Sequence, residues 1–222
     1  MSALELAPGL ALVFDLDGVI LDSMPLHTAV WRDYLHELGI AIEELEERMH
    51  GRRNAEIVRD IIGTHLSEEE IFAHGAAKEA LFREKMRPQL EAHLIRGVRE
   101  FLADAKSLPM AVASNAEPAN IDFVLDGAHL RDYFRVVVDG HQVKRAKPSP
   151  DIYLRAAELL GVQPRNCIVF EDSPAGIEAA MKSGARVVAV ESHTGELPAT
   201  DLRIRDFCEP RLRGWLASLK PR

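Results

Sequence analysis

The sequence predicts an α/β protein: a parallel β-sheet flanked by helices, with a separate group of helices inserted after the first strand. The prediction depends on short apolar runs, most of them rich in Val and Ile, that end at charged or small polar residues. Such runs are typical of buried strands, and the helical stretches between them indicate strand–helix alternation, which builds a parallel sheet covered on both faces. The expected strands are Leu10–Phe14, Met110–Ala113, Val136–Val138, Cys167–Phe170 and Arg186–Val190.

The stretch from about Met24 to Pro88 contains no strand pattern and is too long for one crossover between neighbouring strands. A capping-box pattern, Ser67-Glu68-Glu69-Glu70, opens its last helix. We therefore predict a helical cap at residues 22–91, inserted into a Rossmann-like core of residues 1–21 and 92–222. The expected cap helices are Pro25–Leu38, Ile42–Met49, Asn54–Ile62 and Ser67–Met86.

Two helix starts support the predicted core. Ser149 and Ser173 are each followed by a proline, so each serine can cap a helix whose first residue is that proline. After Asp201 we expect an edge strand, Leu202–Arg205, and a last helix.

The composition is that of a globular protein: of 222 residues, 47% are hydrophobic and 28% charged. The net charge of −8 and the lack of a basic run argue against nucleic-acid binding. Cys167 and Cys208 lack a CxxC partner, so neither a zinc knuckle nor a disulfide framework is indicated. No apolar run is long enough for a signal peptide or a membrane span. We expect a cytoplasmic monomer that binds neither nucleic acid nor membranes.

Two aspartates follow the first expected strand directly. Asp15 and Asp17, with Gly18 after them, lie at the carboxyl end of Leu10–Phe14, where open α/β sheets bind their ligands. Carboxylates this close repel each other unless a cation is present, and hard oxygen ligands suit Mg²⁺. The alternative is an ordinary turn, since Asp and Gly are common turn residues.

Polar residues also follow other expected strands. Ser114 and Asn115 come after Met110–Ala113 and can donate to a phosphoryl oxygen, although Ser-Asn is also a common loop and helix cap. Glu171 and Asp172 come after Cys167–Phe170, where a charged pair is costly unless it is paired or coordinated; Asp172 could instead only cap the next helix.

A lysine completes the set. Lys147 precedes Pro148 and a predicted helix, and its ammonium could neutralise a phosphate or a crowded carboxylate. Lys144 and Arg145 compete for that role and could be plain surface charge, whereas Pro148 and the following helix favour Lys147. A nucleophile, acidic pairs for a metal, and donors for phosphoryl oxygens are together what phosphoryl transfer requires.

At these residues the chain resembles the haloacid dehalogenase superfamily, and within it the β-phosphoglucomutase-like branch. The specific segments are Asp15–Ile20 and Phe170–Ile177. The resemblance implies that Asp15 attacks phosphorus to form an aspartyl phosphate and that Asp17 is the general acid and base. It also implies that Asp15, the backbone carbonyl of Asp17 and Asp172 hold Mg²⁺, with Glu171 supporting the metal site.

The resemblance further implies that Ser114, Asn115 and Lys147 hold the phosphoryl oxygens. Dehalogenases and phosphonate-cleaving members of the superfamily lack the second aspartate of the first motif. Asp17 therefore points to chemistry on phosphate esters.

The cap carries a weaker match. His27 lies at the spacing of a cap histidine that couples substrate binding to acid–base chemistry in sugar-phosphate mutases, and Lys78 lies near a cap lysine of the same enzymes. The segment Gly51-Arg52-Arg53-Asn54 resembles their substrate-recognition loop, but the mutase arginine comes later, where Asn54 stands here. We take His27, Gly51, Arg52, Asn54 and Lys78 as candidate substrate residues. Each could instead be an ordinary helix or surface residue.

Three functions are compatible with this pattern. We expect a Mg²⁺-dependent phosphatase that acts on a small phosphorylated metabolite, a sugar phosphate, through an aspartyl phosphate. The alternative enzyme is a β-phosphoglucomutase-type mutase, which His27 favours and the Gly51–Asn54 segment weakens. A non-enzymatic phospho-acceptor would have similar residues, but there the acidic pair comes early in the chain, whereas Glu171 and Asp172 follow Lys147.

Overall fold

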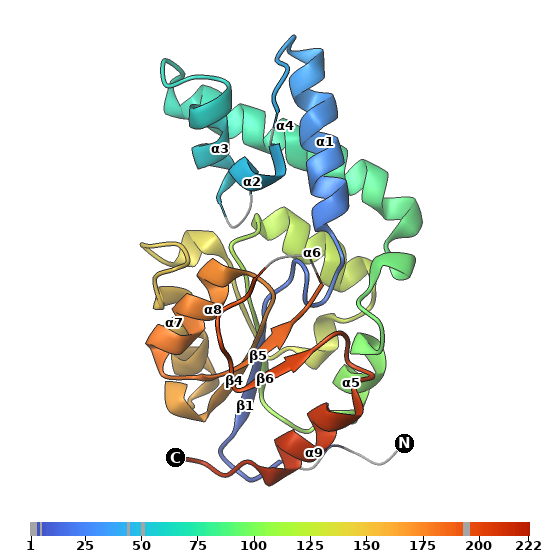
Figure 1. The fold of residues 1–222 in the computed structure, drawn as a ribbon, viewed down its shortest axis with the longest axis vertical. Coiled ribbons are helices and arrows are strands. Elements are labelled where there is room, and N and C mark those ends of the chain that lie inside the picture. Colours follow the sequence, from blue (N-terminus) through green and yellow to red (C-terminus); the bar gives the residue numbers. More distant parts are fainter. Residues whose placement is uncertain (1–3, 5, 44, 50–51, 193–195) are drawn as a thin grey trace.

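A computed structural model describes residues 4, 6–43, 45–49, 52–192 and 196–222. Its centre is a six-stranded sheet in the order β3-β2-β1-β4-β5-β6, in which every neighbouring pair is parallel (Figure 1). This is the order of a doubly wound Rossmann-like fold. The strands are β1 (Ala11–Phe14), β2 (Met110–Ala113), β3 (Val136–Val138), β4 (Cys167–Glu171), β5 (Arg186–Val190) and β6 (Leu202–Ile204).

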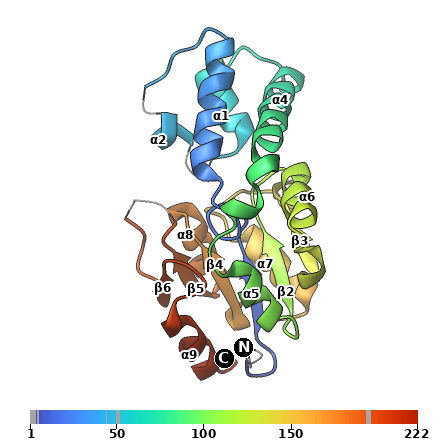
Figure 2. The same ribbon diagram turned by 90° about the vertical axis from the view of Figure 1, so that its right-hand side faces the viewer.

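The core helices cover both faces of the sheet, as Figure 2 shows. Alternate residues of β1 divide between the faces: Leu12 and Phe14 pack in the larger apolar cluster, and Ala11 and Val13 pack in the other. The helices are α5 (Val98–Asp104), α6 (Pro118–Gly127), α7 (Asp151–Leu160), α8 (Pro174–Ser183) and α9 (Pro210–Ser218). Side chains of α5, α6 and α9 pack with the first cluster and those of α7 and α8 with the second.

Aromatic stacking ties the two strands that carry the site. Phe14 of β1 and Phe170 of β4 pair in register, and their rings stack with centroids 4.7 Å apart. The residues that follow, Asp15 and Glu171, are therefore held on neighbouring strand ends.

The helical insertion forms a cap above the carboxyl ends of the strands (Figures 1 and 2). Trp31, Leu35, Ile57, Val58 and Ile71 are among the buried residues of its own small core. The expected capping box is present, with Ser67 and Glu70 bonding reciprocally. The cap helices are α1 (Met24–Glu37), α2 (Leu45–Met49), α3 (Asn54–Ile61) and α4 (Glu68–Met86).

Short 3₁₀ turns connect other elements of the chain. Two follow α4, at Arg87–Gln89 and Glu91–His93, and three lie in the core, at Arg131–Tyr133, Gly140–Gln142 and Pro164–Asn166.

Two expected helix starts are wrong. The second cap helix begins at Leu45 rather than Ile42, in a stretch where the apolar pattern alone does not define the first turn. Helix α7 begins at Asp151 with Pro150 at the capping position, and Ser149 uses its hydroxyl to donate to the Asp151 carboxylate (2.8 Å) instead of accepting a backbone N–H. The cap by Ser173, the edge strand β6 and the last helix are confirmed.

Within the described part of the chain, no helix combines the length and the apolar character needed to cross a membrane.

Candidate active site

The candidate site lies where the strand order of the sheet reverses. Strands β1 and β4 are neighbours, but their crossovers run in opposite directions to β2 and β5, which leaves a crevice outside their carboxyl ends. Asp15 follows β1, Asp172 follows β4 and Ser114 follows β2. Backbone bonds from Asp15 N to Phe170 O and from Ser114 N to Val138 O, both 3.0 Å, extend the sheet as far as these residues. All three side chains are largely buried, and all three residues line one pocket.

Lys147 joins the ends of β1 and β4. Its Nζ donates to Asp15 Oδ1 (2.7 Å) and to Glu171 Oε1 (2.6 Å). Burial would lower the pKa of Lys147, but Asp15 and Glu171 raise it above its ordinary value, so the side chain is a fixed ammonium. Lys144 and Arg145 are exposed, and Arg145 pairs with Asp151. The structure thus selects Lys147 among the three candidate cations.

Glu171 is fully buried, with both carboxylate oxygens bonded. Oε1 accepts from Lys147 and from the Tyr153 hydroxyl (2.6 Å), and Oε2 accepts from the backbone N–H groups of Asp172 (2.9 Å) and Ser173 (3.0 Å). Burial alone would raise the pKa of Glu171. Lys147, Tyr153 and the backbone donors lower it by more than burial raises it, so the carboxylate stays ionised. The arrangement orients Lys147 and the turn that carries Asp172.

The side chain of Glu171 lies where Gly176 of α8 has no side chain. A Cβ built on Gly176 would lie 1.7 Å from Glu171 Oε1. At the other end of the site, Gly18 has φ +73°, and a Cβ there would lie 1.8 Å from Asp172 Oδ2. Both glycines therefore let a site carboxylate pack directly against backbone.

We expect the Gly176→Ala variant to lose about 2 kcal/mol or more of its free energy of unfolding, because Glu171 cannot move aside without breaking several bonds. The matched control is Gly214→Ala in α9, where nothing lies within 4 Å of the added Cβ. That change should stabilise the protein by roughly 0.5–1 kcal/mol. Denaturant unfolding of both variants is the measurement; equal stabilities would contradict the packing argument.

The acidic residues fit a divalent cation. Asp15, Glu171 and Asp172 each offer a carboxylate oxygen, and these oxygens lie within 4.8 Å of one another. Burial raises the pKa of Asp15; Lys147 opposes this, but the neighbouring carboxylates add to it, and the pKa ends well above its ordinary value. The single ammonium of Lys147 thus leaves this cluster short of positive charge. Hard oxygen donors with excess negative charge are the ligand set that Mg²⁺ prefers.

Asp17 faces the cap rather than the other carboxylates. Its Oδ1 accepts from the Ser23 hydroxyl (2.6 Å) and lies 3.7 Å from His27 Nε2. Burial alone would raise the pKa of Asp17. His27 and Ser23 lower it by more than burial raises it, so the net shift of the pKa is downward. Asp17 was predicted as a metal residue through its backbone carbonyl, and that part stays a prediction.

Ser114 and Asn115 follow β2 and line the same pocket as Asp17. Ser114 Oγ accepts from the backbone N–H of Ala116 (3.1 Å), which leaves its hydroxyl hydrogen for another acceptor. The buried Asn115 Oδ1 has no hydrogen-bond partner among the described residues. Both residues line the pocket, as expected for groups that hold phosphoryl oxygens.

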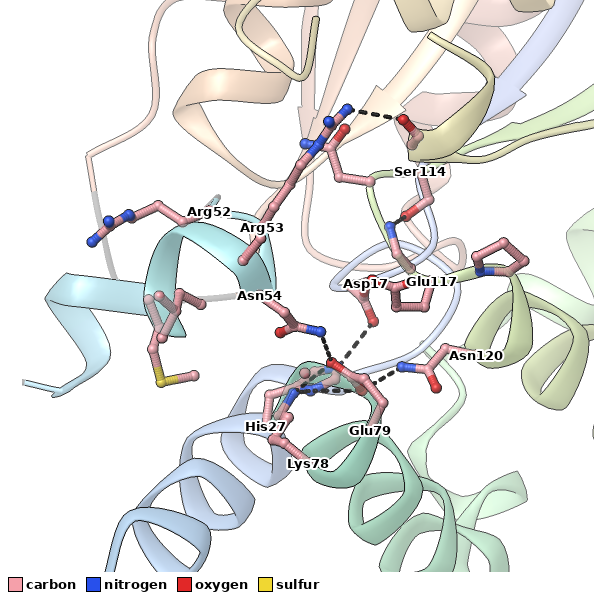
Figure 3. A pocket seen from close by; sticks show the side chains of 18 of the residues that line it. Asp17, His27, Arg52, Arg53, Asn54, Lys78, Glu79, Ser114, Glu117 and Asn120 are labelled. Carbon is pink, nitrogen blue, oxygen red and sulfur yellow. Dashed lines mark hydrogen bonds and ion pairs between the residues drawn. The ribbon is translucent and has the colours of Figure 1, made fainter. Parts of the chain in front are cut away.

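The pocket, of about 740 Å³, lies between the core and the cap, and its lining includes Asp15, Lys147 and Asp172 from the core and His27, Asn54 and Lys78 from the cap. Figure 3 shows the cap side chains meeting below Asp17. Lys78 Nζ contacts His27 Nδ1 (2.6 Å) and donates to Glu79 Oε1 (2.8 Å), and Asn54 Nδ2 donates to the same oxygen (2.7 Å).

The two cap arginines point in different directions (Figure 3). Arg52 bonds to Asp60 Oδ2 (2.9 Å) and to the backbone carbonyls of Arg48 and Glu56, so its charge is held within the cap. Arg53 reaches the core, where its Nη2 donates to Gly140 O (3.0 Å). Arg52 was the arginine predicted to contact substrate, although Arg53 is the one that reaches across the pocket to the core. Gly51 lies outside the described residues.

Three further polar residues of the site were not predicted from the sequence. Glu79 accepts from Lys78, Tyr153 donates to Glu171, and Asn120 at the start of α6 donates to Glu79 Oε2 (2.5 Å). Glu79 and Tyr153 lie within helices and Asn120 near a helix start, so no strand-end pattern marks any of them. Only the position of Glu79 directly after Lys78 could have suggested it.

The fold and the site together define a phosphoryl-transfer enzyme. The sequence model of the haloacid dehalogenase-like hydrolases matches residues 10–184, and the chain belongs to that family. It is 34% identical over 182 residues to the fructose-1-phosphate phosphatase YqaB of Escherichia coli, covering 81% of this chain and 95% of that protein. It is 28% identical over 189 residues to β-phosphoglucomutase of Bacillus subtilis, covering 81% of this chain and 82% of that protein.

Solved structures agree with this assignment. A crystal structure of β-phosphoglucomutase from Clostridium difficile superposes with a TM-score of 0.79 at 29% identity, covering 89% of this chain and 91% of that one. The expected β-phosphoglucomutase-like fold, with a helical cap inserted into a Rossmann-like core, is thereby confirmed.

Proposed function

We propose that this protein is a Mg²⁺-dependent phosphatase of sugar phosphates that works through an aspartyl phosphate on Asp15. The observation that carries the proposal is the meeting of Asp15, Lys147 and Asp172 at the floor of a pocket whose roof is the cap. The similarity to a fructose-1-phosphate phosphatase supports phosphate monoester hydrolysis. We also propose the division of the chain into core, residues 1–21 and 92–222, and cap, residues 22–91.

Asp15 is the nucleophile. Lys147 holds one of its oxygens and leaves the other for attack on phosphorus. Lys147, Ser114 and Asn115 receive the phosphoryl oxygens, because they present an ammonium, a free hydroxyl hydrogen and an amide to the same space. Asp15 and Asp172, with the Asp17 backbone carbonyl, would hold Mg²⁺, and Glu171 would orient Lys147 behind them. A bound Mg²⁺ supplies the positive charge that lets a carboxylate approach a phosphate dianion.

Asp17 transfers the protons. In the first step it protonates the leaving oxygen of the sugar, and in the second it takes a proton from the water that attacks the phosphoenzyme. His27 and Ser23 favour its carboxylate form in the free protein, whereas an arriving phosphate dianion would raise the pKa of Asp17 again. The same carboxyl can thus serve as acid and then as base.

Phosphate release should depend on a divalent cation. We expect a panel of hexose, pentose and hexitol monophosphates to include substrates in the presence of Mg²⁺. Chelation with EDTA should slow release by roughly 100-fold or more, because the metal contributes several kcal/mol to the transition state. The measurement is inorganic phosphate with and without added Mg²⁺. Undiminished release after chelation would contradict the metal assignment.

A sugar-phosphate mutase is the second candidate, favoured by the contact between His27 and Lys78 next to Asp17. Against it, the Arg52 guanidinium is bonded within the cap, to Asp60 and to the backbone carbonyls of Arg48 and Glu56. Incubation with β-glucose 1-phosphate and a trace of the bisphosphate decides: the phosphatase yields inorganic phosphate, whereas the mutase yields glucose 6-phosphate. The expected cytoplasmic location and monomeric state stay predictions.

A further inference from the structure

Asn120 is a core residue whose side chain is bonded at both ends by the cap. It lies in the first turn of α6 and is 3% exposed. Its Nδ2 donates to Glu79 Oε2 (2.5 Å), and its Oδ1 accepts from Arg83 Nη1 (2.7 Å). Glu79 and Arg83 are one turn apart on α4, so a single amide bridges two neighbours on one face of the cap helix. A carboxylate only accepts and a guanidinium only donates, so the orientation of the amide is determined by its partners.

The same carboxylate organises the cap side of the active site. Glu79 Oε1 accepts from Lys78 and from Asn54, and its Oε2 lies 4.0 Å from His27 Nδ1. Burial raises the pKa of Glu79, but Lys78 and His27 outweigh it, so the net shift of Glu79 is downward. Burial lowers the pKa of Lys78, and the neighbouring Glu79 carboxylate opposes that shift.

The position of Lys78 determines which nitrogen of His27 carries a proton. An ammonium can only donate, so when Lys78 carries its charge, His27 Nδ1 accepts from it and the ring proton lies on Nε2, the nitrogen that faces Asp17 (3.7 Å). The ring of His27 stacks on Phe82 of α4 with centroids 3.8 Å apart, which holds its plane. A chain of contacts therefore runs from Asn120 in the core, through Glu79, Lys78 and His27 in the cap, back to Asp17 in the core (Figure 3).

We propose that Asn120 is a positioning residue that clasps the cap to the core in the closed state and, through Glu79, places Lys78 and His27 opposite Asp17. Opening of the cap breaks both bonds of Asn120, whereas the bonds among Asn54, Lys78 and Glu79 lie within the cap and survive. Asn120 is also six positions after Ser114, on the helix that continues the phosphate-binding segment. Closure and acid–base chemistry are thus linked through one amide. The expected effect of Asn120 on catalysis rests on the proposed function, whereas its effect on the position of the cap does not.

The direct test measures the distance between cap and core in the full chain. One spin label is attached to the exposed Cys208 and a second to Glu69→Cys, at an exposed position of α4. Double electron–electron resonance then reports the distance between the two labels. Cys167 is buried, so the label should not react with it. We expect Asn120→Ala to lengthen or broaden the distance distribution, and Asn166→Ala, a half-buried asparagine of the core away from the cap, to leave it unchanged. An unchanged distribution in Asn120→Ala would overturn the clasp. This arm needs no turnover, so it is decided even where the proposed phosphatase function fails.

The kinetic test separates positioning from simple loss of structure. Asn120→Ala should lower kcat/KM roughly ten- to hundredfold at every pH, the range for loss of a buried hydrogen bond to a charged group, and should raise KM. Asn120→Asp can donate to Glu79 only while the introduced carboxyl is protonated. The charged and titratable groups that face this position are Glu79 and Arg83 from α4, His27 from α1, and Glu117 before α6.

Two carboxyls at this distance cannot both ionise without repulsion. The activity of Asn120→Asp relative to the unmodified protein should therefore be highest at acid pH and fall as pH rises. A ratio that stays constant with pH, or an Asn120→Ala variant with unaltered KM and kcat/KM, would overturn the link to the acid–base chemistry.

Discussion

The Asp15→Asn variant should release phosphate at least roughly 10⁴-fold more slowly than the unmodified protein, because a carboxamide cannot attack phosphorus to form an acyl phosphate. The fold should persist, since the amide oxygen has the same shape and can still accept from Lys147. The measurement is steady-state phosphate release together with mass spectrometry of the intact protein for the phosphoenzyme. Asp132→Asn, at an exposed position, is the matched control and should keep full activity.

The same variant should be at least as resistant to heat as the unmodified protein in the absence of a divalent cation. Burial and the neighbouring carboxylates raise the pKa of Asp15 above its unfolded value, so its ionisation opposes folding at neutral pH. Removal of the Asp15 charge relieves its repulsion with the neighbouring carboxylates. Addition of Mg²⁺ should narrow the difference in melting temperature between the variant and the unmodified protein. Undiminished turnover by Asp15→Asn would refute the nucleophile assignment; a large fall in melting temperature would instead show that the charge supports the fold.

Lys147→Met should have the largest effect on stability. Lys147 bonds both Asp15 and Glu171, and removal of one partner from a buried ion pair costs about 3–5 kcal/mol. For a chain of this length that corresponds to a fall in melting temperature of roughly 6–20 °C. Phosphate release should be lost as well, because Lys147 is also proposed to hold a phosphoryl oxygen. Lys182→Met is the control: Lys182 is exposed and pairs with Glu178, so its loss should cost less than about 1 kcal/mol.

The penalty for Lys147→Met should grow with pH. Lys147 lowers the pKa of both Asp15 and Glu171, so without it both carboxyls would have raised pKa values in the folded state. An acid whose folded pKa exceeds its unfolded value destabilises the fold once pH rises above the unfolded pKa, and the cost increases until the folded pKa is passed. Denaturant unfolding at pH 5 and pH 8 measures the difference. A penalty that does not change with pH would mean that the ion pair contributes packing alone.

Much of the core site is predictable from local patterns. Each buried strand is a short apolar run, and in a parallel sheet all carboxyl ends lie along one edge. Asp15, Ser114 and Asp172 follow such runs, so their convergence needs only the strand positions and the direction of the sheet. The cap helices are predictable for the same reason, because their apolar spacing and the Ser67 capping box are local features.

The remaining features depend on contacts between side chains far apart in the sequence. Sequence favoured Lys147 over Lys144 and Arg145 because Pro148 and a helix follow it, but only the folded chain brings its ammonium between two carboxylates. The preference for Arg53 over Arg52 depends on how α3 faces the core, because the first reaches Gly140 and the second reaches Asp60. Such outcomes depend on helix orientation and on the hydrogen bonds that satisfy buried polar groups.

Local patterns along the chain are therefore enough to predict the strands, the inserted helical cap and the residues at the strand ends, because backbone periodicity and strand polarity are local properties. The partners of the buried charges are visible only in the folded protein: Lys147 with Glu171, and Glu79 with Asn120. A buried charge must be satisfied by whichever donor or acceptor the packing brings within about 3 Å, and packing is a property of the whole chain.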